Sequence, residues 1–407
     1  MSRRKIINDP VFGFITIPND FLLSILSHPY LQRLTRIRQM GLSYLVYPGA
    51  THTRLLHSIG AMHLMSEAVA QLRLQGLEIT HDEGNAVMAA ILLHDVGHAP
   101  FSHVLENTLV NGITHEDISL MMMEKINREM NGQLDLAISI FKDQYHKHFL
   151  HQLVSSQLDV DRLDYLCRDS FFCGVSEGTV ASARILKMLT VVDDRLVVEA
   201  KGIYSVEKFL VARRLMYWQV YLHKTSVAAE QMLIKILSRA KFLSTLNSQL
   251  STLNSISPAL QYFLARKIDK STFSSEDLEQ YALLDDSDIL AAVKVWSASE
   301  DIILSTLCKA FTNRRLFKTK LLDAPFSEEE TNLLRQRYAK ELNISEQDAG
   351  YLFSLHTASK DTYNPLDDSI DILYKDGTIK DISKASDMLN LSVLTKKVKK
   401  HYLFYLP

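Results

Sequence analysis

Apolar residues recur every three or four positions over most of the chain, which predicts a mainly α-helical protein. Residues 21–40 show this spacing with an interruption at Pro29, because a proline disfavours a helix in the residue before it. Residues 54–74 predict a further helix, and the unbroken apolar run over residues 87–93 is typical of a buried one. The same spacing continues from residue 205 to beyond residue 238 and predicts one long helix.

Alternating apolar and polar residues are confined to short segments, which predict small β elements at the periphery. The predicted elements are a strand over residues 11–17, a hairpin over residues 191–199, a hairpin over residues 370–382 and a closing strand over residues 402–406. The second hairpin contains an Asp-Gly pair, which favours a tight turn. The sequence therefore predicts a helical core with peripheral β-hairpins.

Residues 244–257 are the best candidate for a linker, because they are rich in serine, threonine and asparagine and are followed by Pro258. This segment divides the chain into residues 1–243, which carry most of the chemically suggestive residues, and residues 244–407. The pattern of residues 244–407 predicts several helices and a terminal β-hairpin. We therefore expect an α+β C-terminal region. We expect it to serve oligomerisation or regulation.

Composition narrows the class of protein. With 47% hydrophobic and 23% charged residues, the 407-residue chain is typical of soluble globular proteins, and its net charge of -2 gives no electrostatic reason to bind nucleic acid or membranes. No apolar run approaches the length of a membrane span, and the first residues lack the apolar stretch of a signal peptide. Cys167, Cys173 and Cys308 show no CxxC spacing and argue against disulfides. We expect a cytoplasmic protein without membrane or nucleic-acid partners.

Residues 90–103 join an apolar run to several polar residues that can bind metals. The predicted buried helix delivers His94 and Asp95 at its C-terminal end, where Gly97 and Pro100 stop the helix. An imidazole and a carboxylate then lie side by side, and divalent metals such as zinc, manganese, iron and nickel accept this combination. The pair predicts half of a metal coordination shell, which other segments must complete.

Two further segments carry residues of the same kind. His57 follows Arg54 by one helical turn, so the two side chains share a face. Residues 150–169 predict an amphipathic helix with four acids, Asp159, Asp161, Asp164 and Asp169. A lone histidine beside apolar residues is more often a hydrogen-bonded structural group than a ligand, and a lone acid on such a helix is often merely solvated. Only the residues taken together favour a site.

His57, His94-Asp95 and Asp161 follow the order His, His-Asp, Asp that defines the HD superfamily of metal-dependent phosphohydrolases, and the chain resembles a member of it. The resemblance implies an HD-domain helical core within residues 1–243. It also implies one divalent transition metal per chain, bound by His57, His94, Asp95 and Asp161. The metal would be manganese, iron, nickel, cobalt or zinc, with magnesium as an alternative.

Four segments resemble, more narrowly, the deoxynucleoside triphosphate triphosphohydrolases. These enzymes include a dGTPase-like group and a mammalian type that joins a SAM domain to an HD domain. The segments are residues 54–60, 94–103, 115–116 and 159–169. The likeness runs from about residue 9 to about residue 240, and we expect no SAM domain before it. It implies hydrolysis of deoxynucleoside triphosphates to deoxynucleoside and inorganic triphosphate, with a metal-bound water attacking the α-phosphorus.

Phosphate binding needs positive charge, because a triphosphate carries about four negative charges near neutral pH. By the resemblance, Arg54 would contact the α-phosphate, and Arg162 and Arg213 would hold further phosphates. His98 and His103 would line the path of the phosphates. The mammalian type has a lysine where this chain has Arg162, and a forked guanidinium changes the phosphate contact.

Hydrolysis must also stabilise the leaving 5′-oxygen, which calls for a general acid whose pKa lies near the working pH. We predict His115 for this role, with Glu116 or Glu106 orienting a histidine, and His98 as a second catalytic candidate. The alternative for His115 is an exposed histidine at a helix N-terminus.

The resemblance also assigns contacts to the sugar and the base. Tyr165 and Asp169 would bracket the sugar, with Asp169 accepting a hydrogen bond from the 3′-hydroxyl group and Tyr165 excluding ribonucleotides. Gln39 matches a position that reaches the sugar and base, and Tyr221 matches one near the base.

Other functions stay open at this point. The chain could hydrolyse nucleoside monophosphates or cyclic nucleotides, or be a catalytically idle HD protein that senses nucleotides or binds nucleic acid. Family members are often oligomers gated by nucleotides at subunit interfaces, so we expect a homo-oligomer, a dimer or tetramer, and a nucleotide activator. His223-Lys224 and residues 314–320 are the candidates to hold that activator, and a solvated basic helix end is the alternative for the second segment.

Overall fold

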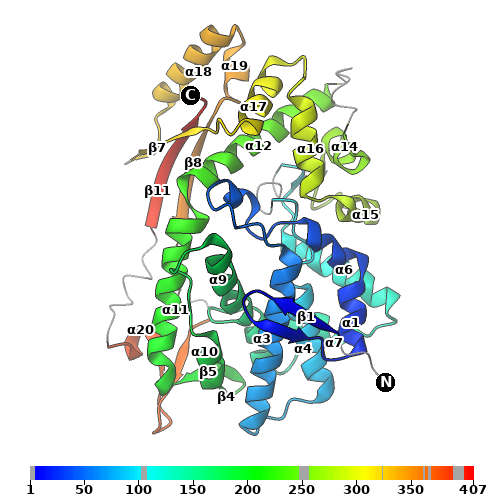
Figure 1. The fold of residues 1–407 in the computed structure, drawn as a ribbon, viewed down its shortest axis with the longest axis vertical. Helices are drawn as coiled ribbons and strands as arrows, with labels where there is room; N and C mark the ends of the chain where they lie inside the picture. Colours follow the sequence, from blue (N-terminus) through cyan, green and yellow to red (C-terminus); the bar gives the residue numbers. More distant parts are fainter. Residues whose placement is uncertain are drawn as a thin grey trace.

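The structure is a computed structural model that describes residues 5–101, 108–246, 256–322, 324–360, 363–364, 368–387 and 398–407. Helices dominate this part of the chain and its strands form small sheets, which confirms the predicted fold class (Figure 1). Three helices form the centre of the site described below: α3 (Arg54–Leu74), α4 (His81–Leu93) and α9 (Val160–Cys173). α3 packs against both of the others.

Local sequence signals explain the bounds of α3 and α4. The Thr53 side chain accepts a hydrogen bond from the backbone of Leu56 at the start of α3. Thr80 and Glu83 form a capping box at the start of α4. All side chains from Ala86 to Leu93 are buried, as the apolar run predicted, and α4 ends so that His94 is its C-cap.

Shorter elements surround this centre. They are α1 (Asp20–Ser27), α2 (Pro29–Gln32), η1 (Arg33–Arg36), η2 (Gly41–Leu45), α6 (His115–Glu129), α7 (Asp135–Phe141), α8 (His148–Val154), α10 (Ser182–Met188) and η3 (Ala200–Gly202). The interruption predicted before Pro29 is confirmed between α1 and α2. The N-terminal hairpin of β1 (Ile6–Asp9) and β2 (Gly13–Thr16) packs on α3, and the predicted strand over residues 11–17 corresponds to β2 alone.

The single long helix predicted from residue 205 onward is wrong, because three helical segments replace it. α11 (Ile203–Leu215) passes into the π-helical η4 (Met216–Tyr221), and α12 (Lys224–Thr245) starts anew after His223. The backbone of His223 is non-helical, at φ -59 and ψ 127, and its ring accepts a hydrogen bond from the Thr225 backbone. Apolar residues keep their helical spacing on both sides of His223, so this spacing does not reveal so short an interruption.

The two predicted hairpins are confirmed and lie in one sheet. β4 (Leu189–Val192) pairs with β5 (Arg195–Glu199), and β9 (Asp371–Leu373) pairs with β10 (Ile379–Asp381). β9 also runs parallel to β5, which gives the order β10-β9-β5-β4. The C-terminal region therefore extends a sheet that begins in the N-terminal region.

Most of the C-terminal region lies in the upper part of Figure 1, where helices accompany a second sheet. The sheet contains β7 (Lys318–Leu322), β11 (Val398–Tyr405) and β8 (Phe353–Lys360), and β11 includes the predicted closing strand. A short parallel pair joins β3 (Val110–Asn111) to β6 (Ile268–Asp269). The helices are α14 (Pro258–Ala265), α15 (Ser275–Leu283), α16 (Asp286–Trp296), α17 (Ile302–Thr312), α18 (Glu328–Leu342), α19 (Glu346–Ala349) and α20 (Ile382–Ala385).

The predicted division between residues 243 and 244 falls within α12, and most of the linker candidate lies outside the described residues. Buried apolar residues before and after this point belong to one continuous core. The division stays a prediction. None of the described helices combines the length and the apolar character that a membrane span requires.

Candidate metal centre and active site

Three predicted metal ligands from three helices meet in the structure. His57 lies on α3, His94 caps the end of α4, and Asp161 lies in the first turn of α9. Asp161 Oδ1 is 3.0 Å from His57 Nε2 and 3.4 Å from His94 Nε2. These side chains form a group whose ligand atoms are close enough to share one ion.

The hydrogen bonds of the two histidines fit a metal. His94 Nδ1 faces the Ile91 carbonyl oxygen at 2.6 Å, and His57 Nδ1 faces Asp164 Oδ2 at 2.7 Å. A carbonyl and a carboxylate accept, so each Nδ1 carries the proton and each Nε2 can offer a lone pair. Both Nε2 atoms are buried and make no hydrogen bond with a described residue. The residues therefore fit a divalent metal, which His57, His94 and Asp161 would hold.

The charges of this group also favour a bound metal ion. Burial alone would lower the pKa of His57, but the adjacent carboxylates of Asp161 and Asp164 raise it to about 10. Burial would likewise raise the pKa of the Asp161 carboxyl, but His57 and His94 hold it below its usual range. The carboxylates thus attract positive charge into the group, and a cation can supply that charge in place of protons.

Asp95, the fourth predicted ligand, lies at the edge of this group. Its Oδ1 is 3.3 Å from His94 Nε2 and 3.3 Å from His98 Nε2, and its Oδ2 is 3.8 Å from His57 Nε2. Arg54 Nη1 donates to the same Oδ2 at 2.5 Å. Although burial opposes ionisation, His94, His98 and Arg54 hold the pKa of Asp95 well below its usual value. Asp95 therefore connects the metal group to the predicted phosphate contact.

Gly97 allows this turn to pack closely on α6. A Cβ atom at this position would overlap the Ser119 backbone nitrogen and lie 2.5 Å from the His115 carbonyl oxygen. The Gly97 nitrogen donates to Ser119 Oγ at 2.9 Å. The glycine predicted as a helix stop is therefore needed mainly for close approach.

The C-terminal region also holds this turn. Tyr281 on α15 donates to the Gly97 carbonyl oxygen at 2.9 Å, and Asp286 on α16 accepts from the Phe101 nitrogen at 3.1 Å. Buried Arg33 donates to the His98 carbonyl oxygen at 2.9 Å. These contacts could not be predicted from the sequence, because each joins residues that are more than sixty positions apart.

The predicted catalytic histidines lie together. The rings of His98 and His115 stack with centroids 3.8 Å apart, and Thr114 is the N-cap of α6. His115 Nε2 is 3.2 Å from Glu116 Oε1, whose side chain is 60% exposed. Burial and the Arg54 guanidinium hold the pKa of His98 well below its usual value. His103 and Glu106 lie outside the described residues.

The other predicted phosphate contacts, Arg162 and Arg213, each have a polar partner. Arg162 Nη1 donates to Asp159, the N-cap of α9, and Arg213 Nη1 donates to Gln157 Oε1 at 3.0 Å. The Nε atoms of both arginines are buried without a partner among the described residues. Both guanidinium groups are close enough to Tyr165 to act on the pKa of its hydroxyl, which burial raises.

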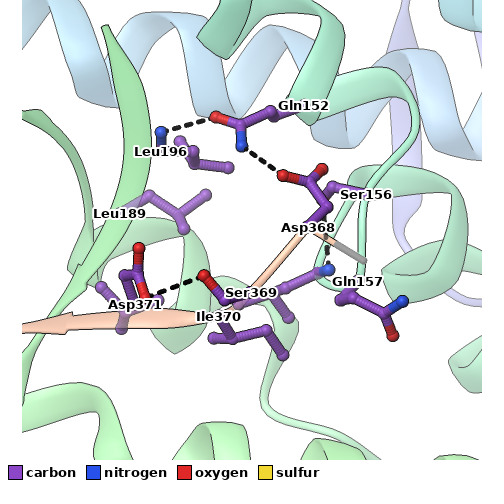
Figure 2. Close-up of a pocket in the computed structure, with 11 residues that line it drawn as sticks. Gln152, Ser156, Gln157, Leu189, Leu196, Asp368, Ser369, Ile370 and Asp371 are labelled. Carbon is purple, nitrogen blue, oxygen red and sulfur yellow. Dashed lines mark hydrogen bonds between the residues drawn. The ribbon is translucent and has the colours of Figure 1, made fainter. Parts of the chain in front are cut away.

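Figure 2 shows a cavity beside the loop that carries Gln157. Its volume is about 20 Å³, which is room for one water molecule and not for a nucleotide. Gln152 donates to Asp368 Oδ1 at 2.7 Å and accepts from the Leu196 nitrogen at 2.7 Å. Because Gln152 lies on α8, these bonds attach α8 both to the segment before β9 and to β5.

The predicted sugar contacts form a second buried cluster. The Tyr165 and Tyr221 rings lie 6.1 Å apart, and Tyr221 donates to Asp169 Oδ2 at 2.9 Å. Asp169 Oδ1 is 2.7 Å from His52 Nε2. The Gln39 backbone nitrogen donates to the His52 carbonyl oxygen at 3.0 Å. The buried Oε1 of the Gln39 side chain has no hydrogen-bond partner among the described residues.

The sequence pattern did not predict roles for His52, Asp159 or Gln157. Asp159 carries a recognisable signal, since an aspartate directly before a helical pattern is a common N-cap. His52 and Gln157 carry none, because neither shares a helical turn with the residue it contacts.

Comparisons with known proteins agree with this geometry. A model of the HD domain matches residues 54–169, and a model of an HD associated region matches residues 180–256. The uncharacterized protein YwfO of Bacillus subtilis is 33% identical over 420 residues, with 100% of this chain and 93% of that protein covered. A phosphohydrolase structure from Bacteroides thetaiotaomicron is 59% identical, with a TM-score of 0.95 over 100% of both chains.

Some of the relatives have a named reaction. The deoxynucleoside triphosphate triphosphohydrolase SAMHD1 homolog of Dictyostelium discoideum is 30% identical over 266 residues, which are 60% of this chain and 51% of that protein. The family matches and the whole-length relatives support the family that the sequence predicted. The chain therefore belongs to the HD-domain superfamily of phosphohydrolases.

Proposed function

We propose that this protein hydrolyses deoxynucleoside triphosphates to deoxynucleoside and inorganic triphosphate, as a dGTPase-like enzyme. One observation carries the proposal: the His57, His94 and Asp161 group, in which two buried imidazole nitrogens have no hydrogen-bond partner among the described residues, lies beside arginines and a tyrosine cluster. The named reaction of the Dictyostelium relative supports it. A divalent metal bound by the group supplies a Lewis acid and lowers the pKa of water.

Three arginines neutralise the triphosphate in this proposal. Arg54 is held against Asp95, so its guanidinium stays beside the metal group and faces the α-phosphate. Arg162 and Arg213 keep donors that no described residue uses, which suits further phosphate oxygens. Because Asp159 and Gln157 fix one nitrogen of each side chain, little conformational entropy is lost on binding.

His115 donates the proton to the leaving 5′-oxygen, and Glu116, which contacts Nε2, orients its ring. His98 stacks on that ring and lines the phosphate path. At the other end, Asp169 accepts from the 3′-hydroxyl group, and Tyr165 closes the space that a 2′-hydroxyl group would need. Gln39 and Tyr221 lie at the base side of the same cluster.

The proposal includes a homo-oligomer with a nucleotide activator at an interface. The two basic segments predicted for the activator lie side by side. Thr319 Oγ1 donates to the Lys224 carbonyl oxygen at 3.4 Å, and Arg314 Nη2 donates to the Leu45 carbonyl oxygen at 2.8 Å. Arg314, Lys318 and Lys224 therefore gather positive charge near η2.

Product analysis tests the reaction. Purified protein is incubated with Mn²⁺, Mg²⁺ or Co²⁺ and the four deoxynucleoside triphosphates, singly and in pairs, because one nucleotide can activate hydrolysis of another. We expect deoxynucleoside and triphosphate in the chromatogram. Deoxynucleoside monophosphate with pyrophosphate would show that a different bond is cleaved. Binding without turnover under every metal would favour an idle nucleotide sensor.

A matched pair of variants tests the metal group. His94→Ala should abolish turnover and metal binding, because it removes one of the unbonded nitrogens. His81→Ala, at the exposed opposite end of the same helix, should leave both unchanged. Equal activity of the two variants would contradict the assignment.

Metal stoichiometry tests the alternative function. Asp95, His98 and His115 form a second group whose ligand atoms lie within reach of one ion. One metal per chain supports the proposal. Two metals, together with hydrolysis of monophosphates or cyclic nucleotides, would favour the alternative HD hydrolase activity.

A further inference from the structure

His52 is a fully buried histidine that the proposed chemistry does not use. It lies in the loop before α3, and its side chain is 0% exposed. Its Nε2 lies 2.7 Å from Asp169 Oδ1, and the Asp169 side chain is only 4% exposed. Because a buried carboxylate is costly without a donor, this contact helps to hold Asp169 in place.

The orientation of Asp169 is fixed from two sides. His52 binds Oδ1 from the loop before α3, and Tyr221 donates to Oδ2 from η4 at 2.9 Å. One donor on each oxygen fixes the rotation of the carboxylate as well as its position. Each oxygen can accept more than one hydrogen bond, so the carboxylate keeps capacity for a donor from a ligand.

His52 is itself held rigidly. Its ring stacks on Phe172 with centroids 4.4 Å apart and an interplanar angle of 17°. Phe172 follows Asp169 by three residues on α9, so one turn of helix supplies both the stacking partner and the carboxylate. The His52 carbonyl oxygen accepts from the Gln39 nitrogen at 3.0 Å. His52 thus joins Asp169 and Gln39, two of the residues predicted to contact the sugar.

Nothing else among the described residues uses the His52 ring for hydrogen bonding. Its Nδ1 is buried without a hydrogen-bond partner, so the ring's single polar contact is with Asp169. A histidine kept only for packing would leave that nitrogen unsatisfied at a cost that leucine or phenylalanine avoids.

We propose that His52 is a positioning residue that sets the preference for a 3′-hydroxyl group, by holding Asp169 as the acceptor of that group. The inference rests on the proposed function. A site built around a buried acceptor rejects a ligand that lacks the matching hydroxyl group, because the acceptor is then left without its donor. When His52 no longer holds Asp169, the carboxylate can turn away from the ligand. The preference for ligands with a 3′-hydroxyl group then decreases.

The test compares kcat/KM for a deoxynucleoside triphosphate and its 2′,3′-dideoxy counterpart. Wild type should prefer the 3′-hydroxyl substrate. His52→Leu should lower kcat/KM for that substrate about 10- to 100-fold and leave the dideoxy substrate nearly unchanged. His52→Gln places an amide nitrogen near the Nε2 position and should restore most of the preference. His52→Asn is too short to reach and should not.

Metal content and the melting temperature of each variant are measured in parallel, because a merely structural role would lower activity on both substrates together. Equal losses on both substrates, or no difference between the Gln and Asn variants, would overturn the inference. The Gln and Asn pair carries the test if the Leu variant does not fold. Wild type that turns over deoxynucleotides without preferring the 3′-hydroxyl group overturns this inference alone, whereas wild type without turnover overturns the proposed function and the inference with it.

Discussion

The two sides of the His57 ring lie in very different surroundings. Beyond Nδ1 is a buried network in which Arg168 donates through Nε and Nη2 to Asp164 and through Nη1 to Asp9, at 2.7 to 2.9 Å. Asp9 Oδ1 also accepts from two backbone nitrogens of the N-terminal hairpin. Beyond Nε2 lie Asp161 and His94, where two buried nitrogens make no hydrogen bond with a described residue.

This difference separates a structural cluster from a functional one. Both sides are charged and buried, so burial alone does not distinguish them. Native proteins satisfy almost all buried polar atoms, and a group of unsatisfied ones that converge marks the place where a ligand completes the bonding. The side beyond Nδ1, called the saturated side because its polar atoms are hydrogen-bonded, holds His57 in place. The side beyond Nε2 is left to bind a ligand.

Asp164→Asn should give the largest effect, because it removes a charge that serves both sides. Burial would raise the pKa of Asp164, but Arg168 and His57 lower it, so the native carboxyl is ionised. We expect a loss of about 3 to 5 kcal/mol in unfolding free energy from the broken ion pair. Metal affinity should fall about 10- to 100-fold, because the partner of a metal-binding histidine raises its basicity. Denaturant unfolding and metal titration measure the two effects.

Asp9→Asn is the matched control for that variant. It takes a carboxylate from the same Arg168 guanidinium but does not touch His57. It should therefore destabilise the protein and leave metal affinity unchanged. If both variants lose metal affinity equally, the two sides of His57 are not separable as described.

The grouping of His57, His94 and Asp161 could be predicted from sequence because these residues follow the His, His-Asp, Asp order of the family. For His94 the continuous apolar run before it is a further signal. The network behind them could not be predicted. Asp9 and Arg168 are 159 positions apart, and no periodicity relates a turn in the N-terminal hairpin to a helix of the core.

The same limit applies to the sugar side. Asp169 and Tyr221 were predicted by family resemblance, but the donor that holds Asp169 comes from a loop, where residues carry no periodic signal. The helix break at His223 was also missed, because local backbone geometry there does not disturb the apolar spacing. Patterns detect faces of helices, whereas contacts between elements depend on how the elements pack.

Gly60→Ala should have the next largest effect, because the added methyl group would disturb the hydrogen-bonded network beyond Nδ1 of His57. A Cβ atom on Gly60 would overlap the Arg168 guanidinium and the Asp164 carboxylate, both of which are buried and fully bonded. We expect a loss of up to about 3 kcal/mol in unfolding free energy and a smaller loss of metal affinity than in Asp164→Asn. Thermal unfolding and metal titration measure these.

Gly350→Ala is the control for that substitution. Gly350 lies in the C-terminal region, and its added Cβ would meet one carbonyl oxygen at 3.1 Å. It should change stability less and metal affinity not at all. A larger loss of stability at Gly350 than at Gly60 would argue against tight packing as the reason for the glycine in α3.

Glu83→Gln should have the smallest effect, because Glu83 is a saturated carboxylate far along α4 from the metal group. It accepts from Tyr145 Oη, Lys147 Nζ and the Thr80 nitrogen at 2.7 to 2.9 Å. Burial would raise its pKa, but these partners, Lys147 first, lower it to about 2. Glutamine preserves the capping box and removes the charge, so we expect a loss of about 1 to 2 kcal/mol at pH 7.

The pH dependence of this loss separates charge from shape. A carboxyl whose folded pKa is lowered stabilises the protein above its unfolded pKa, and this contribution disappears as the pH falls through the folded pKa. Because the ordinary pKa is 4.5 and the folded value about 2, the gap between wild type and Glu83→Gln should narrow steadily below about pH 5. Metal affinity at pH 7 should match wild type. A gap that stays constant down to pH 3 would mean that the amide fails by shape, and a loss of metal affinity would mean that a saturated carboxylate outside the His57 network also controls the metal group.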